Sequence, residues 1–519
     1  MTRSERVVAA GGAHRDAAAT REASPAGSGP WRSPRLLAGA VLAGYLAVLV
    51  AISLHEYRTF NLSWDFGQAE QAWHLIAHGT LDPYDSLHHH AWWQDHAALL
   101  IWLLAPLYWL APNDGLTLLV VQDVAIVVAV AAAADWAVLF CTRRGARPAV
   151  TATCVSALLA LCVFNVGLYA TVLYDFHDQV LGVAFLVLTG RDVYAGRNRR
   201  AVLWAALTLL SMDLSALNLA ALGAGLALTE RRLRRPGVAM VAAGAAWYLA
   251  AGLLGGTKGT TLSYYDALAG RRLTGGLGDY LSILRGAAAH PSRVWHQLTV
   301  YRYRLYEDLI PSGVIGLLEP AVLLPIIVVV VPGALSSYGG FVKLGFQNCA
   351  AYILAALGTA LVLARMATRP GHRSRLWPVV AVAAGAVAVG LACDGSVAVR
   401  GAEVDYSVSG AAAHQLAAVR QLTPAEAEVA VPFGVVGRFS GRRYVYLIHD
   451  LPWTLPVRAS RVEVVFAPRA GNEWLPLPKV AAAEAALVGR YRARVLYLGS
   501  EVQAYTVEDA PIGATITLP

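Results

Sequence analysis

The sequence predicts an all-α polytopic transmembrane bundle followed by a small α/β domain outside the membrane. Of the 519 residues, 57% are hydrophobic and only 15% are charged, and the mean hydropathy is +0.50. Soluble globular proteins are about one quarter charged. The apolar residues also come in blocks of the roughly 20 residues that span a bilayer. Together these features predict about 8–11 membrane segments, some of them broken or re-entrant.

The distribution of apolar residues predicts the order of the elements. Residues 1–33, rich in Ala, Gly, Ser and Arg, are expected to form a disordered tail. The transmembrane domain is expected at 34–395, with long polar loops at 55–96 and 256–310. Its apolar segments are 36–54, 97–111, 116–140, 149–171, 179–194, 201–229, 237–255, 311–333, 346–366 and 377–393.

Runs of arginine between these segments predict the orientation. They lie at 143–147, 197–200, 231–235 and 365–375, as the positive-inside rule expects of cytoplasmic loops. The net charge of +8 therefore reflects topology, and we expect no nucleic-acid partner. The prediction is a multi-pass protein of a bacterial plasma membrane. Its N-terminus would be cytoplasmic, and both long loops and the C-terminal domain extracytoplasmic.

Keeping all four runs on one side requires that three segments do not cross as continuous helices. These are 97–111, which is short, and 201–229 and 311–333, which are predicted to be broken or re-entrant. Non-helical backbone at membrane depth must be covered by protein or line a water-filled cavity. The interrupting residues are Pro106, then Ser211-Met212-Asp213, then Pro320, Pro325 and Pro332.

The last part of the chain, 396–519, is predicted to be a small soluble extracytoplasmic domain. Short β-like runs occur at 428–431, 443–448, 462–466 and 494–498, and a helical stretch at 480–491 precedes the last of them. This alternation predicts an α/β or α+β domain.

The first outside loop, 55–96, concentrates polar residues. Seven of the 14 histidines lie in it, together with six acidic residues and one arginine. Such a loop fits a site for a cation or for proton transfer. The run His88-His89-His90 also fits a solvated turn, and the HExxH spacing of zinc proteases is absent. Apolar and polar residues are interspersed over 65–78 in the pattern of an amphipathic helix, which is expected to lie along the membrane surface.

Further ionisable residues lie at the margins of apolar segments. Asp95-His96 precedes 97–111, Asp175-Phe176-His177-Asp178 separates two segments, and Asp213 interrupts 201–229. Ionisable residues at such depths are costly and mark a site or a buried pair. We expect Asp65, Asp95, His177 and Asp178 to converge on one cavity, with structural hydrogen bonding as the alternative.

At these residues the sequence resembles a prokaryotic membrane-protein family catalogued as a domain of unknown function, which is similar to the GT-C superfamily of membrane glycosyltransferases. The resemblance covers most of 36–395. The matching motifs are Trp64-Asp65-Phe66-Gly67 with Glu70-Gln71 and Trp73; Asp95-His96 with Ala105-Pro106-Leu107-Tyr108; and Asp175-Phe176-His177. The chain departs from the family where Ser211-Met212-Asp213 replaces Lys-Glu-Asp and where Gln347-Asn348 replaces His-Tyr.

The resemblance implies a GT-C-like fold and an enzyme that takes a sugar from a polyprenyl-phosphate donor. The acceptor would be a cell-envelope glycan or protein on the extracytoplasmic face. In GT-C enzymes an acidic residue of the first outside loop acts as base or metal ligand, and that role falls on Asp65. A divalent cation, Mg²⁺ or Mn²⁺, would be held by Asp65 and Asp95. A non-catalytic membrane scaffold and a transporter or flippase-like protein remain as alternatives.

The expected site residues fall into two groups. The candidate catalytic residues are Asp65, Asp95, His96, His177 and Asp178. The candidate substrate-binding residues are Glu70, Gln71, Trp73, Asp213, Arg271, Arg272, Arg302 and Arg304.

Overall fold

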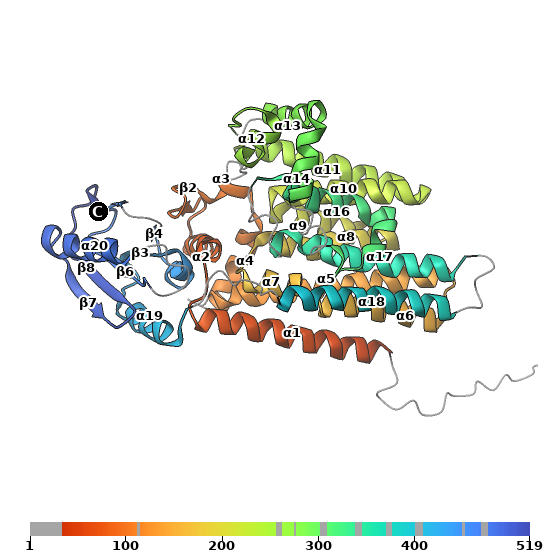
Figure 1. Ribbon diagram of the computed structural model, residues 1–519, viewed down its shortest axis with the longest axis horizontal. Coiled ribbons are helices and arrows are strands. Elements are labelled where there is room, and N and C mark those ends of the chain that lie inside the picture. The colour runs from red at the N-terminus through yellow and green to blue at the C-terminus, as the bar shows by residue number, and fades with distance from the viewer. Residues whose placement is uncertain are drawn as a thin grey trace, which may run out of the picture. The chain divides into compact units, whose positions relative to one another are not determined.

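The structure is a computed structural model that describes residues 34–111, 115–255, 262–274, 277–300, 309–337, 345–369, 376–399, 408–448, 452–468 and 476–519. Residues 42–519 form one compact unit. Most of this unit is helical, and a small sheet-containing domain follows the last long helix (Figure 1). The predicted fold class, a helical membrane bundle with a small α/β domain, is confirmed.

The helical part is built from long and short helices. Helices α5, α6, α8, α17 and α18 lie side by side (Figure 1). The principal helices are α1 (Pro34–Arg58), α2 (Trp64–Ala77), α3 (Trp92–His96), α4 (Leu100–Leu110), α5 (Leu116–Arg143), α6 (Pro148–Val163), α7 (Val166–Leu173), α8 (Asp178–Ala195), α9 (Asn198–Ser211), α10 (Asp213–Thr229), α11 (Arg234–Leu253), α12 (Asp266–Ala269), α13 (Leu277–Ala289), α14 (Pro291–Val300), α16 (Pro320–Leu335), α17 (Cys349–Ala367) and α18 (Leu376–Val399).

Five of the described helices are long and apolar enough to cross a membrane, and the bent pair α6–α7 makes a sixth if it forms one span. Three shorter apolar helices, α4, α10 and α16, lie in the segments that were expected to be short, broken or re-entrant. Helix α8 has sufficient length but contains three charged residues, Asp178, Arg191 and Asp192.

The three segments that were expected not to cross as continuous helices are indeed short or interrupted. Helix α4 has 11 residues, about 16 Å of helix, against a hydrocarbon thickness of about 30 Å. The backbone of Met212 is extended and separates α9 from α10. In the third segment, a 3₁₀ helix (Val314–Leu318) is followed by Glu319 with an extended backbone, and α16 begins at Pro320.

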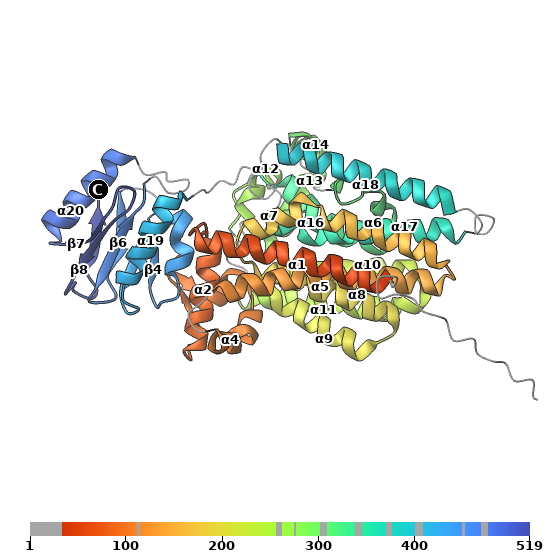
Figure 2. The same cartoon turned by 90° about the horizontal axis from the view of Figure 1, so that it is seen from below.

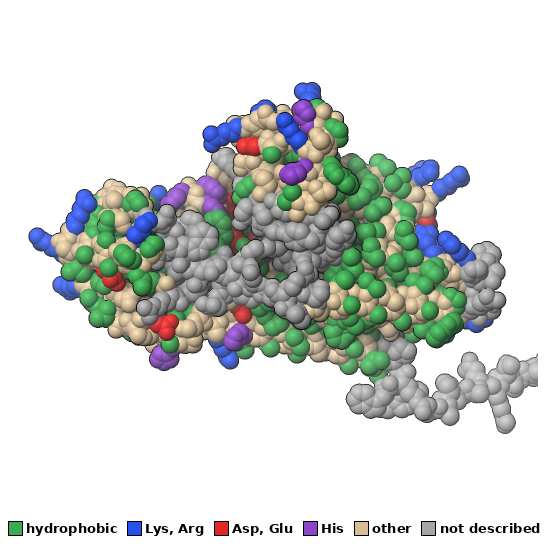
Figure 3. Space-filling model, in the orientation of Figure 1, with side chains coloured by type: hydrophobic (Ala, Val, Ile, Leu, Met, Phe, Trp, Pro, Cys, Tyr) green, Lys and Arg blue, Asp and Glu red, His purple; other side chains and the backbone are tan. Residues whose placement is uncertain are grey.

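Arginines from separate runs meet at one end of the bundle. Arg143 and Arg232 both donate hydrogen bonds to the Tyr194 carbonyl, and Arg365 lies over the Phe140 ring. Figure 3 shows Lys and Arg side chains (blue) at the right-hand end of an apolar helical surface (green). The tertiary structure therefore brings Arg143, Arg232 and Arg365, from three of the four runs, to the same end, which agrees with the positive-inside prediction.

Helices α10 and α11 pack with their backbones in close approach. A Cβ at Gly237 would lie 2.4 Å from the Gly223 carbonyl oxygen and 2.9 Å from the Ala227 Cβ. Small residues allow such contacts between membrane helices.

Gly237→Ala is therefore expected to destabilise the protein by about 1–3 kcal/mol, because the added methyl group forces the two helices apart. The measurement is the Tm of the purified protein in detergent. Gly385→Ala on α18 is the matched control, because nothing lies within 4 Å of a Cβ at Gly385. Equal Tm values for the two variants would contradict this packing.

The C-terminal domain has a five-stranded mixed sheet between helices. The strand order is β4-β3-β6-β8-β7, in which β3 is parallel to β4 and β6. Helix α20 packs on one face of the sheet, and α19 with the 3₁₀ helix η7 (Phe433–Phe439) packs on the other (Figure 2). The elements are α19 (Gly410–Leu422), β3 (Glu428–Pro432), β4 (Val445–Ile448), β5 (Trp453–Pro456), β6 (Val462–Phe466), α20 (Leu477–Arg490), β7 (Arg494–Leu498), β8 (Gln503–Val507) and β9 (Thr515–Leu518), with β5 and β9 paired separately.

Helix α2 forms where expected, but it is not simply a surface helix. Ten of its 14 residues are buried, because it packs against α4 on one side and against η7 of the C-terminal domain on another. The polar side chains of α2 therefore face protein as well as solvent.

Candidate active site

The N-terminus of α2 is held by a residue from a distant loop. Asp175 precedes α8, and one of its carboxylate oxygens accepts a hydrogen bond from the Ser63 N–H (2.7 Å) and another from the Ser63 hydroxyl. Asp175 is buried and has a left-handed backbone, with φ of 79°. This contact joins the two motif segments that contain Asp65 and His177.

Helix α5 fixes the same loop from the other side. The side-chain amide of Gln122 donates to the Asp175 carbonyl, and its oxygen accepts from the His177 N–H, each at 2.7 Å. Both ends of this side chain are therefore used to hold residues 175–177. Phe176 between them is buried in the core around α2 and α4.

Asp65 and His177 face each other across this junction. The His177 Nε2 lies 3.4 Å from a carboxylate oxygen of Asp65, although 112 residues separate them in the chain. The Asp65 side chain is 23% exposed and that of His177 is 11% exposed. A partly open carboxylate beside an imidazole can exchange a proton with a bound hydroxyl group.

A second group joins the end of α3 to the break between α9 and α10. The His96 Nδ1 lies 3.5 Å from Asp213, and its Nε2 lies 4.0 Å from Asp95. Asp213 is fully buried as the first residue of α10, and neither of its carboxylate oxygens has a hydrogen-bond partner among the described residues. The left-handed backbone of Ala97 (φ 45°) turns the chain directly after His96.

The carboxylates make this region electronegative. Partial burial alone would lower the pKa of His96, but Asp213, Asp95 and Asp65 outweigh it and raise that pKa to about 9. The same balance raises the pKa of His88, where Asp85 is the main partner and Asp95 and Asp65 also contribute. Asp65 therefore acts electrostatically on both histidines.

Asp178, the first residue of α8, is also buried, and its Oδ1 has no hydrogen-bond partner among the residues that the structure describes. The structure thus brings together Asp65 with His177, and Asp95 with His96 and Asp213.

One group of described residues has metal-ligand spacing, and it consists of His88, His90 and Asp95. Asp65, which was expected to share a metal with Asp95, is not in that group.

A family model described as "Predicted membrane protein (DUF2079)" matches residues 58–474. The chain belongs to this family. The expected membership in a membrane-protein family of unknown function is confirmed.

Two solved structures show a distant likeness. The crystal structure of ArnT from Cupriavidus metallidurans bound to undecaprenyl phosphate is 12% identical, with 91% of this chain and 99% of that chain covered and a TM-score of 0.46. The apo structure of the same protein is 10% identical, with coverages of 92% and 100% and a TM-score of 0.45. The comparison with curated proteins gave no match.

In this DUF2079 member, three of the expected substrate-binding residues face the protein interior. Trp73 is fully buried, and its indole N–H donates to the Leu104 carbonyl at 2.9 Å. Gln71 donates to Ser86 and to the Arg443 carbonyl of the C-terminal domain, and Glu70 is buried beside it. The observed contacts of Trp73 and Gln71 hold α2, the loop and the C-terminal domain together, and a role in substrate binding stays a prediction.

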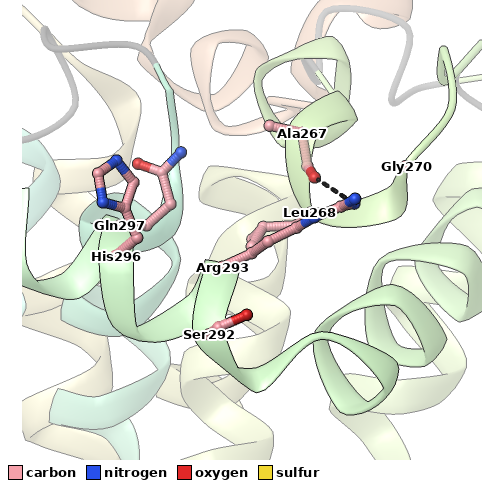
Figure 4. Close-up of a pocket in the computed structure, with 7 residues that line it drawn as sticks. All are labelled: Ala267, Leu268, Gly270, Ser292, Arg293, His296 and Gln297. Carbon is pink, nitrogen blue, oxygen red and sulfur yellow. Dashed lines mark hydrogen bonds between the residues drawn. The ribbon is translucent and has the colours of Figure 1, made fainter.

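Of the four arginines expected to bind substrate in the second outside loop, the structure describes Arg271 and Arg272, and no described contact joins either of them to the Asp65–His177 pair. Arg271 is paired with Asp279 and Ser282 of α13, and Arg272 is exposed. Arg302 and Arg304 lie outside the described residues. A pocket in this loop is lined by Ala267, Leu268, Gly270, Ser292, Arg293, His296 and Gln297. Figure 4 shows Arg293 reaching the Ala267 carbonyl across it, and it shares no residue with the Asp65 group.

The two departures from the family motif lie in well-packed positions. The Ser211 hydroxyl donates to the Thr208 carbonyl and contacts Ser215, and a Cβ on Gly182 of α8 would lie 2.2 Å from it. Asn348 is buried, and Gln179 of α8 donates to the Gln347 carbonyl at 3.3 Å. Ser211 thus allows a close contact between α8 and α9.

Sequence reasoning missed the residues that position the site. Ser63, Gln122 and Asp85 were not expected, and Asp175 was noted only as part of a motif. The charge of Asp175 beside two apolar segments was the one available signal. Ser63 and Gln122 are ordinary polar residues whose partners lie far away in the sequence.

The C-terminal domain docks on α2 through a glycine. The Gly437 N–H donates to the Leu62 carbonyl at 3.1 Å, and a Cβ at this position would lie 2.7 Å from both Leu62 and Phe66. Arg438 extends the contact by donating to the Tyr57 carbonyl.

Gly437→Ala is therefore expected to lower stability by about 1–3 kcal/mol and to loosen α2, because the methyl group cannot fit against Phe66. Amide hydrogen exchange along α2 should become faster and the Tm should fall. Gly489→Ala on α20, where a Cβ meets nothing within 4 Å, should do neither. Unchanged exchange along α2 in Gly437→Ala would mean that the docking is not held by this contact.

Proposed function

We propose that this protein is a membrane glycosyltransferase that moves a sugar from a polyprenyl-phosphate donor to a cell-envelope glycan or protein. The observation that carries the proposal is the meeting of Asp65 and His177 at 3.4 Å in a partly exposed position. The resemblance to GT-C enzymes assigns the base to the same carboxylate. The contact with His177 and the partial exposure of Asp65 support this assignment.

The proposed reaction needs a base at the acceptor. The acceptor hydroxyl attacks the anomeric carbon of the donor sugar, and its proton passes to the Asp65 carboxylate. The bond between that carbon and the phosphate oxygen breaks, and polyprenyl phosphate leaves with the electron pair. His177 would orient Asp65 through their contact.

The proposed orientation places this chemistry outside the cytoplasm. On α5, Gln122 holds the site and Arg143 lies in the arginine-rich end. The helical rise separates them by about 32 Å, close to the hydrocarbon thickness of about 30 Å. If the arginines face the cytoplasm, Asp65 and the C-terminal domain face the opposite side.

The test is transfer by the purified full-length protein in detergent, with a panel of radiolabelled polyprenyl-phosphate sugars and both glycan and protein acceptors. Acceptor-dependent release of polyprenyl phosphate with formation of a new glycoside is the expected result. No turnover on any donor by well-folded protein would reject the proposal and favour the scaffold reading.

A transporter or flippase-like function is the second candidate, because Asp213 is buried at a break between two helices and the His96 Nδ1 lies 3.5 Å from its carboxylate. Discontinuous helices bind coupling ions in many transporters. Reconstitution into liposomes distinguishes the two. Movement of labelled polyprenyl-phosphate sugar across the bilayer that is lost in Asp213→Asn, with no glycoside formed, would favour transport.

A further inference from the structure

The first outside loop contains a hairpin that presents two histidines side by side. Strands β1 (Tyr84–Asp85) and β2 (His90–Ala91) pair antiparallel, and His89 in the connecting turn has a left-handed backbone, with φ of 62°. A non-glycine residue pays a conformational cost there. The result is that the rings of His88 and His90 stack at a centroid distance of 5.4 Å and an interplanar angle of 5°.

Asp95 at the end of α3 completes the group. One nitrogen of each histidine and one carboxylate oxygen of Asp95 all lie within 4.8 Å of one another, and the His90 Nε2 is 3.9 Å from Asp95. Ligands of a tetrahedral ion at about 2.0–2.1 Å lie roughly 3.4 Å apart. Side-chain rotations that move each ligand atom by about 0.5–1 Å would therefore bring the three atoms to the spacing of a tetrahedral ion.

The second nitrogen of each ring already has a partner. The His88 Nδ1 lies 3.0 Å from Asp85 and also contacts the Gln68 side-chain amide, and the His90 Nδ1 lies 3.1 Å from the Ala91 carbonyl. Metal-binding histidines usually donate their other ring N–H to a carboxylate or a carbonyl group, which fixes the ring and leaves Nε2 for the ion.

Asp85 is itself held firmly. Its side chain is 1% exposed, and it accepts hydrogen bonds from the Gln68 amide (2.6 Å) and the Leu87 N–H (2.8 Å). Gln68 belongs to α2, three residues after Asp65. The buried Asp85 carboxylate thus orients the partly exposed His88 imidazole. The proposed transfer reaction does not use Asp85, whereas a metal site would.

We propose that His88, His90 and Asp95 bind a first-row transition ion such as Zn²⁺. Two imidazoles and one carboxylate suit Zn²⁺ and similar ions, whereas Mg²⁺ prefers oxygen ligands in an octahedron. Three protein ligands leave a position open for water or a substrate oxygen, as in catalytic zinc sites. This site differs from the Mg²⁺ or Mn²⁺ ion expected at Asp65 and Asp95, and it does not depend on the proposed transfer activity.

The test is binding of Zn²⁺ to the full-length protein after removal of metal by a chelator, measured by calorimetry in detergent. Co²⁺ replaces Zn²⁺ in a parallel titration, in which intense visible absorption reports a four-coordinate site. We expect one ion per chain. Both His90→Ala and Asp95→Asn should abolish binding, and Asp85→Asn should weaken it by about 10- to 100-fold.

The matched control is His89→Asn. It removes a neighbouring imidazole that stacks on Tyr446 instead, and Asn tolerates the left-handed backbone of this position. This variant should bind Zn²⁺ like the wild type. Each variant is first checked for an unchanged elution volume and Tm without metal.

Three results would overturn the proposal. The first is a wild-type protein that binds no Zn²⁺. The second is equal loss in His89→Asn and His90→Ala, which would indicate adventitious binding by a histidine-rich surface. The third is binding that survives His90→Ala but is lost in His78→Ala, which would place the ion at the His74–His78 pair, whose rings are 4.3 Å apart.

Discussion

Replacing Asp65 by asparagine is expected to lower the rate of sugar transfer by about 100- to 10,000-fold, the contribution typical of a general base. Asparagine has nearly the same shape and can keep the contact with His177, but it cannot accept the proton of the acceptor hydroxyl. Because the lost interaction belongs to the transition state, kcat should fall while the KM for the donor changes little. Initial rates with the best donor of the panel measure both.

The control for this variant is Asp82→Asn. Asp82 is an exposed acidic residue of the same loop, so the two variants make the same change in net charge. Asp82→Asn should keep the wild-type rate. If Asp65→Asn retained more than a tenth of the wild-type kcat, Asp65 would not be the base, although a transferase with another base would still be possible.

Asp175→Ala is expected to have the second-largest effect, a loss of about 100-fold in transfer rate. The substitution leaves the buried Ser63 N–H without its acceptor, at a cost of about 1–3 kcal/mol. It also releases the start of α2, and a displacement of about 1 Å at a reacting group can cost 100-fold in rate. Asp175 is thus a positioning residue that acts through Asp65.

Asp175→Asn tests whether the hydrogen bonds to Ser63 position the site. Its side-chain oxygen can still accept both hydrogen bonds from Ser63, and asparagine tolerates the left-handed backbone of this residue. The asparagine variant should therefore recover most of the transfer rate that alanine loses. Equal rates for Asp175→Ala and wild type, at equal Tm, would show that the contact with Ser63 does not position the site.

Local sequence patterns predicted much of the C-terminal domain. Runs of β-branched and aromatic residues marked β3, β4, β6 and β7, and the helix at 480–491 was found as α20 (Leu477–Arg490). Helix α19 and strands β5, β8 and β9 were missed. Their recognition depends on the sheet that they cover or extend, and an Ala-rich stretch such as 410–422 does not show this alone.

The pattern of α2 was read correctly as a helix, but the prediction of its surroundings was incomplete. Periodicity tells which residues share a face, and it does not tell what covers that face. Gln71 and Trp73 are expected to bind substrate because they belong to the family motif around Asp65. Their actual partners, Arg443 and Leu104, come from segments that the periodicity of α2 cannot indicate.

The sequence by itself determined that this is a multi-pass membrane protein with a small α/β domain, because hydropathy and local periodicity depend only on neighbouring residues. It also marked Asp65, Asp95-His96, His177 and Asp213, since charges beside apolar segments are costly and rarely occur without a partner. Only the tertiary structure decided which of these charges meet. Asp65 reaches His177 across 112 residues of chain, because Ser63 and Gln122 fix residues 175–177 beside the start of α2. His96 likewise reaches Asp213 only in the folded chain.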